Sequence, residues 1–197
     1  MLITSLFGCS SSRTAIPTSG DSLRSITILV DDFKPQPYGG QSVYYFNRVE
    51  GDRGTLNNSD VVWSDGQVTT TISSGNSWGG LWMSLNHPAR ENQSINFSAV
   101  LPPQILPEYQ SQITGITIQI ARGSPGKTFR IEFKDNNDLR WQGEIVLTGR
   151  QQDANFELPV LGNVSQIILV LDQASEGDFV TIESISLSAK TPVIDTA

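Results

Sequence analysis

Short stretches in which apolar and polar residues alternate recur along most of this chain, and they constrain the fold more than any other feature. About ten of them have the period of a β-strand, and turn-forming Gly, Pro, Asn and Asp residues separate them. The stretches between them lack the apolar spacing of an amphipathic helix. The candidates are VVW, QVTTTIS, GLWMSLN, SINFSAVLP, ITGITIQIA, TFRIEFKD, RWQGEIVLT, NFELPV, VSQIILVLD and DFVTIESISLS, preceded by SITILVDDF. The pattern predicts an all-β protein, either a two-sheet sandwich or a barrel.

Composition limits what such a protein can be. A chain of 197 residues with 38% hydrophobic residues is long enough for one well-packed domain and short for two. The net charge of -7 provides no basic field for a phosphate backbone, so we expect no nucleic-acid partner. Cys9 is the one cysteine, which excludes an internal disulfide and a cysteine-based metal cluster.

The N-terminal segment MLITSLFGCSSS resembles the lipobox of bacterial lipoproteins, in which the cysteine carries the lipid. A signal peptide has a basic start and roughly 7 to 15 apolar residues, whereas eight residues without a basic one precede Cys9. Either a true start lies upstream, or the segment is an ordinary tail. We expect residues 1–22 to be a lipoprotein-like signal and tether, residues 23–190 the β-sandwich domain, and residues 191–197 a tail. No other segment is apolar enough over the length of a membrane span.

A long, weakly periodic region follows the first predicted strand. Its prolines and glycines favour loops around at most one strand, near Val43 to Asn47. Long loops in compact domains are often functional. The charged stretch FNRVEGDRG within it makes Arg48 a candidate ligand-binding residue, although such alternating charges are more often a solvated loop.

Strand alternation separates core residues from surface residues. In FRIEFK, the apolar residues share one face, so Arg130, Glu132 and Lys134 share the other; in ITIQIA, Gln119 lies on the polar face. In GLWMSLN, Leu81, Met83 and Leu85 share a parity, which places Trp82 on the polar face.

A tryptophan on a polar sheet face suits a binding platform. A pyranose has apolar C–H faces and hydroxyls at its edge, so its site needs an aromatic surface and a hydrogen-bonding rim. The candidate ligand-binding residues are Trp82, Gln119, Arg130, Glu132, Lys134 and Arg48. The alternative is that the long loop covers Trp82 as a second small core. For Trp78, in a glycine-rich turn, packing is the favoured interpretation.

The order of the strands resembles the galactose-binding-like jelly-roll family of carbohydrate-binding modules. The resemblance rests on VDDF, on ITGITIQIARG followed by KTFRIEFKDNNDLRW, on FELPVLGNVSQIILVLD and on GDFVTIESISLS. It implies a two-sheet antiparallel β-sandwich in which the first and last strands pair and the ITIQI strand lies beside the FRIEF strand. It also implies a structural calcium near these terminal strands, with Asp32, Glu183 and Asp178 as candidate ligands, and a poly- or oligosaccharide as partner.

A second resemblance leaves another function open. The complex I intermediate-associated protein family also opens with an aromatic and acidic strand and a double-glycine loop comparable to PYGGQS, and its members are assembly factors. Catalysis is poorly supported, because a glycosidase pair such as Glu132 with Glu50 or Asp52 is easily found among 20 acidic residues. The sequence therefore predicts a non-enzymatic carbohydrate-binding domain, extracellular or in the cell envelope and lipid-anchored through Cys9. A protein-interaction module of the same fold is the alternative, and a glycoside hydrolase the less favoured one.

Overall fold

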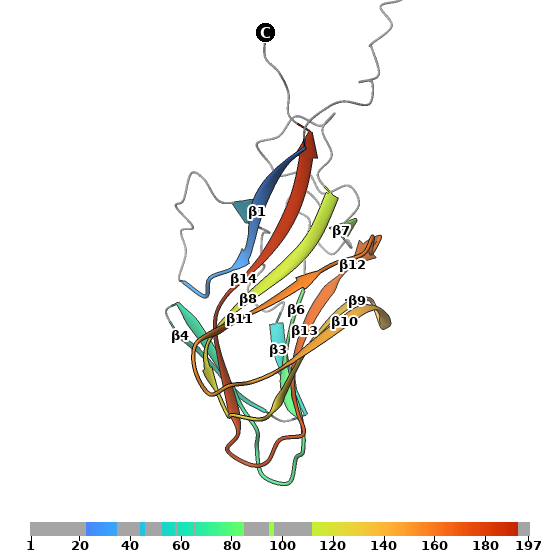
Figure 1. The fold of residues 1–197 in the computed structure, drawn as a ribbon. Helices are drawn as coiled ribbons and strands as arrows, with labels where there is room; N and C mark the ends of the chain where they lie inside the picture. The colour runs from blue at the N-terminus through green and yellow to red at the C-terminus, as the bar shows by residue number, and fades with distance from the viewer. Residues whose placement is uncertain are drawn as a thin grey trace, which may run out of the picture.

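Two large β-sheets make up most of the part of the chain that the structure describes (Figure 1). This computed structural model describes residues 23–34, 44–45, 53–57, 59–64, 66–84, 95–96 and 112–192. Within these ranges all the regular structure is β-strand. No described segment is a helix that could span a membrane.

The larger sheet has seven strands in the order β11-β8-β14-β1-β2, with β5 paired to β14 and β4 to β5. Its strands are β1 (Leu23–Asp31), β2 (Tyr44–Tyr45), β4 (Asp60–Ser64), β5 (Gln67–Thr71), β8 (Gln112–Gly123), β11 (Gln152–Glu157) and β14 (Phe179–Pro192). All pairings are antiparallel except that of β1 with β2. The predicted pairing of the first long strand, β1, with the last, β14, is confirmed.

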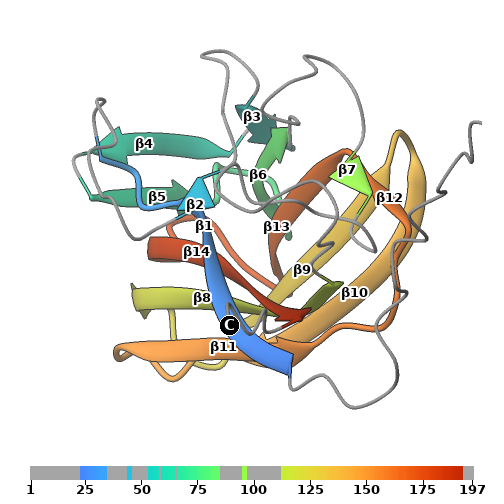
Figure 2. The same ribbon diagram turned by 90° about the horizontal axis from the view of Figure 1, so that it is seen from above.

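The smaller sheet has five strands in the order β10-β9-β13-β6-β3, and it lies against the larger one as a second layer (Figure 2). Its strands are β3 (Arg53–Leu56), β6 (Gly79–Ser84), β9 (Thr128–Asp135), β10 (Asp138–Val146) and β13 (Gln166–Asp172). A further small sheet joins β7 (Ile95–Asn96) to β12 (Asn163–Val164). The two-sheet, predominantly antiparallel β-sandwich predicted from the sequence is confirmed.

The core lies between the two sheets and follows the predicted alternation. Every second residue of β9 is fully buried in it, as are the isoleucines of β8. The buried set from these two strands is Ile116, Ile118, Ile120, Phe129, Ile131 and Phe133. Burial of so many branched and aromatic side chains is the main source of stability for a chain without a disulfide.

Two of the four tryptophans, Trp63 and Trp141, pack on this core. The Trp63 ring lies 6.0 Å from that of Phe33, and the Trp141 ring lies between those of Phe133 and Phe156, at 5.8 and 5.3 Å. Both are partly buried against the core. The structure therefore assigns both of them to packing.

Two expectations about strands were wrong. The ITIQI strand, β8, and the FRIEF strand, β9, follow each other along the chain but belong to opposite sheets, so they face each other across the core. Strand β3 lies in a region expected to be loop, because its sequence RGTL has neither the length nor the alternation of a strand. Its pairing with β6 supplies the hydrogen bonds that the local sequence did not indicate.

Candidate functional site

The side of the five-stranded sheet that points away from the core is called here its outer face, and β9 projects three charged residues onto it. Phe129, Ile131 and Phe133 point into the core, so Arg130, Glu132 and Lys134 alternate with them outward, as the sequence predicted. This outer face carries the candidate site.

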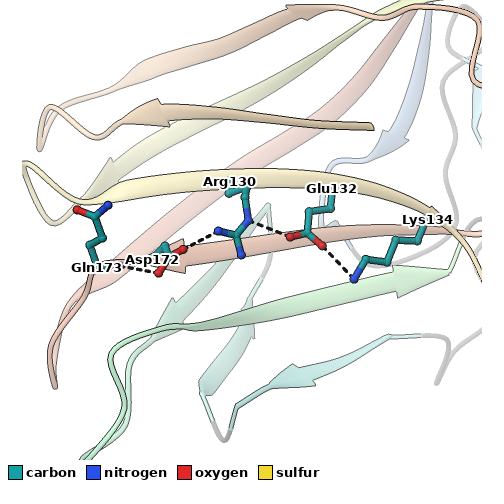
Figure 3. Close-up of polar contacts among 5 residues, drawn as sticks. All are labelled: Arg130, Glu132, Lys134, Asp172 and Gln173. Atoms are coloured by element: carbon teal, nitrogen blue, oxygen red, sulfur yellow. Dashed lines mark hydrogen bonds and ion pairs between the residues drawn. The ribbon is translucent and has the colours of Figure 1, made fainter. Parts of the chain in front are cut away.

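These charges form one continuous chain of ion pairs, shown in Figure 3 and called here the polar ladder: Asp172, Arg130, Glu132 and Lys134. Arg130 Nε donates to Glu132 Oε1 at 2.9 Å, and Arg130 Nη1 donates to Asp172 Oδ2 at 2.5 Å. Lys134 Nζ lies 3.0 Å from Glu132 Oε2. The two oxygens of Glu132 therefore contact two different cations, which fixes the direction of its carboxylate.

Partial burial strengthens the ladder. The Glu132 side chain is 12% exposed, and those of Arg130 and Lys134 are about a quarter exposed. Burial alone lowers the pKa of Arg130, but hydrogen bonds and charge attraction from Glu132 and Asp172 outweigh it and raise that pKa. The guanidinium is therefore a permanent cation of this face.

Trp82 lies in the same cross-strand row as Glu132. In the register of the sheet, Ile168 of β13 is opposite Trp82 on one side and Glu132 on the other. Adjacent strands are about 4.8 Å apart, so the Cα atoms of Trp82 and Glu132 are separated by roughly 10 Å. The sequence prediction that Trp82 shares a face with the charged residues of β9 thus holds in the structure.

The indole of Trp82 lies over Gly54 of β3. A Cβ atom at Gly54 would lie 2.5 Å from Trp82 Nε1, so only glycine leaves room for the ring in this position. Trp82 is half-buried, so it is neither a fully exposed surface residue nor a core residue.

Two apolar residues lie between the aromatic ring and the ladder. Ile168 and Val170 of β13 are 7% and 2% exposed, yet neither belongs to the core cluster. The outer face therefore combines an indole, an apolar central strand and a row of fixed hydrogen-bonding groups. An indole surface beside hydrogen-bonding groups is the chemistry that a sugar ring requires.

Gln119 does not belong to this site. It lies on β8, on the outer side of the opposite sheet, where its Oε1 accepts a hydrogen bond from Ser184 Oγ at 2.7 Å. The expectation that it neighbours Trp82 was wrong, because the sequence does not show which sheet an alternating strand joins.

The opposite sheet has a hollow of about 500 Å³ on its outer side. Its lining includes Gly115, Thr117, Asn155, Ser188 and Lys190. The one aromatic residue in this lining, Phe156, packs its ring against Trp141 of the core side. We place the candidate site at Trp82 and not in this hollow, because the hollow has no indole and no ladder of fixed charges.

Trp78 differs from its predicted role. The sequence favoured packing for this residue, but Trp78 is 41% exposed. A glycine-rich flank indicates a turn, and it does not determine whether the turn folds inward or outward.

Several sequence-based candidates lie outside the described residues. They are Cys9 with the predicted signal and tether, and Arg48, Glu50 and Asp52 in the long loop region. Their predicted roles stay predictions.

The three candidate calcium ligands have separate partners. Asp32 pairs with Lys34 at 3.4 Å, Glu183 Oε1 accepts from Gln67 Nε2 at 3.5 Å, and Asp178 pairs with Lys127 at 3.0 Å. Among the residues that the structure places, no cluster of three His, Cys, Asp or Glu side chains could hold a metal. Calcium binding at these residues stays a prediction from the family resemblance.

Sequence reasoning missed two contributors to the site. Gly54 was assigned to a loop, and Asp172 was not singled out, although it ends the strand QIILVLD. The acidic residue at the end of the apolar run IILVL was a usable signal, because a charged side chain at the end of a buried strand is expected to reach the surface.

Comparison with known proteins identifies the fold. No family model and no curated protein matches this sequence. A solved carbohydrate-binding module of family 29, in a single-substitution variant, matches with a TM-score of 0.52 and 8% identity over 85% of this chain and 92% of that chain. A second family 29 structure, from a series on ligand recognition, matches with a TM-score of 0.51 and 10% identity over 85% of this chain and 86% of that chain. A third family 29 structure matches with a TM-score of 0.51 and 10% identity over 85% of this chain and 89% of that chain.

The fold is therefore the galactose-binding-like jelly-roll β-sandwich of these carbohydrate-binding modules. At such low identity the likeness extends to the fold and not to individual residues.

Proposed function

We propose that this protein is a non-catalytic carbohydrate-binding module that holds a poly- or oligosaccharide on the outer face of its five-stranded sheet. The observation that carries the proposal is the row formed by Trp82, Ile168 and Glu132, because it places an indole and an ordered hydrogen-bonding rim on the same face of the sheet. The C–H face of a pyranose stacks on the indole, and its hydroxyls exchange hydrogen bonds with Glu132 and Lys134. The fold shared with family 29 carbohydrate-binding modules supports this proposal.

The ladder favours binding over hydrolysis. A glycosidase acid must donate a proton to the leaving oxygen and needs a second carboxylate across the bond. Glu132 instead contacts two cations, and the other carboxylate of the ladder, Asp172, pairs with Arg130. Groups held in this way are suited to fixed hydrogen bonding.

A glycan array tests the proposal. We expect the wild-type protein to bind a subset of glycans and Trp82→Ala to lose about tenfold or more in affinity for them, because the stacking surface is removed. Gln119→Ala, on the opposite sheet, is the matched control and retains binding. Equal loss in both variants, or no glycan binding by the wild type, would contradict the proposal; a protein captured instead would favour an interaction module.

We further propose that the domain is exported and lipid-anchored through Cys9, which places it in the cell envelope or outside the cell. The support is the lipobox-like MLITSLFGCSSS followed by a Ser-, Thr- and Gly-rich stretch. Expression of the full chain in a bacterium with a lipoprotein pathway tests this. The wild type is expected in the membrane fraction and Cys9→Ala in the soluble fraction, whereas identical fractionation contradicts the anchor.

A further inference from the structure

Trp78 and Trp82 lie along one line of the outer face. Trp78 directly precedes β6, and a Cβ atom at the next residue, Gly79, would meet the buried side chains of Ser59 and Ile72. Because Gly79 faces the buried side, the residue before it, Trp78, is placed on the other side, and Trp78 is exposed. Within β6, Trp82 alternates with the buried Leu81 and Met83 and so also points away from the core. The two tryptophans are four residues apart in the chain, so their Cα atoms are separated by at most roughly 13 Å. Gly80, between them, leaves the strand without a side chain there.

The polar ladder extends over the same length. The register pairs Leu171 with Gly79, so Asp172 lies at the level of Trp78. Glu132 lies at the level of Trp82, as described above. The polar ladder therefore extends from the level of one tryptophan to the level of the other. Glu132, on β9, is two strands away from Trp82, and Asp172, on β13, is one strand away from Trp78.

Hydrogen bonds hold the Trp78 segment in place. Asn57 Nδ2 donates to the Trp78 carbonyl oxygen at 2.8 Å, and Ala174 N donates to the Ser77 carbonyl oxygen at 2.9 Å. These contacts come from two different connections, one after β3 and one after β13. An exposed indole on an anchored backbone loses little freedom when a ligand stacks on it, which favours binding.

We propose that Trp78 is a second stacking position of the same site and that the ligand is an extended oligosaccharide lying along β6. This inference rests on the proposed function. One pyranose covers one indole, so only a longer chain reaches both tryptophans while its hydroxyls meet the ladder. It also explains why a large aromatic side chain stays exposed at this position.

Chain-length dependence tests the inference. Calorimetric titrations measure the affinity of wild type, Trp78→Ala and Trp82→Ala for a disaccharide and for a hexasaccharide. The sugars are those of each glycan that binds on the array, and cello- and manno-oligosaccharides are the first probes. We expect Trp78→Ala to weaken hexasaccharide binding about tenfold and to leave disaccharide binding within about twofold of wild type. Trp82→Ala weakens both. Trp78→Tyr, which keeps an aromatic ring, restores part of the loss, and Val160→Ala is the control for an exposed apolar residue elsewhere.

The outcomes separate the inference from the proposed function. If Trp82→Ala weakens both ligands but Trp78→Ala changes neither, or changes both equally, the second stacking position is wrong and the proposed function stands. If Trp82→Ala binds as the wild type does, or no glycan binds, both fail. Thermal unfolding of each variant identifies loss of folding, and the Trp78→Tyr variant decides the question if Trp78→Ala is unfolded.

Discussion

The outer sides of the two sheets obey the same strand alternation but carry different chemistry. The five-stranded sheet has an indole and a ladder of long charged side chains. The seven-stranded sheet has polar groups that satisfy each other in separate pairs, as in the bond from Thr117 Oγ1 to Asn155 Oδ1 at 2.8 Å and the bond from Ser184 Oγ to Gln119 Oε1 at 2.7 Å. Separate polar pairs offer a sugar no flat apolar surface, whereas an indole and long charged side chains can contact its face and its edge together. A β-sandwich thus offers two similar surfaces, and the types of side chain on each decide which one suits binding.

The largest expected effect comes from the ladder. Glu132→Gln keeps the shape but leaves Lys134 without its carboxylate and Arg130 with one partner in place of two. We expect the free energy of unfolding to fall by about 2 kcal/mol in urea titrations, because a partly buried charge loses its partner.

The matched control lies on the other sheet. Glu183→Gln changes a carboxylate that accepts one long hydrogen bond, from Gln67 at 3.5 Å. We expect a change below about 0.5 kcal/mol. Similar losses in the two variants would show that the two faces do not differ energetically.

A smaller effect is expected where Trp82 lies over β3. In Gly54→Ala the new methyl group meets the indole and displaces it, so glycan affinity falls by about fivefold although position 54 carries no ligand-binding group. Thr55→Ala, next to it on β3, controls for changes to the strand, and intrinsic fluorescence of the free protein reports the displaced ring. If the fluorescence spectrum of Gly54→Ala shifts but its glycan affinity equals that of the wild type, the position of the Trp82 indole does not matter for binding.

The smallest expected effect is on stability at acid pH, and it comes from Asp178, which directly precedes β14. Burial opposes ionisation of Asp178, but hydrogen bonds from Lys127, Ser175 and Ser124 outweigh it and lower the pKa below its ordinary value of 3.8. The ionised form therefore stabilises the fold fully above that value, and this contribution is lost as the pH falls below it.

Asp178→Asn tests this contribution. We expect the variant to be slightly less stable than wild type at neutral pH and to lose less stability between about pH 4 and pH 2. Parallel stability curves would exclude Asp178 as the acid-sensitive group. Asp153→Asn, an exposed change on β11, is the control.

Much of the fold was predictable because alternation is a local property. The TFRIEFKD strand was predicted with the bounds that the structure gives to β9, and the buried parity of β8 was also correct. Strand β3 was not predictable, since its residues RGTL become a strand only by pairing with β6. For the candidate site, the sequence indicated Trp82 and the three charged residues of β9, but it added Gln119 from the wrong sheet and assigned Trp78 to packing.

The sequence by itself determined which side of each strand faces the core, because every second residue of an extended chain points the same way. It also determined the all-β class and the absence of a disulfide. Only the tertiary structure decided which strands share a sheet, since pairing depends on contacts between residues far apart in the chain. That pairing brings Asp172 to Arg130, Gly54 under Trp82, and the row of Trp82, Ile168 and Glu132 into one face.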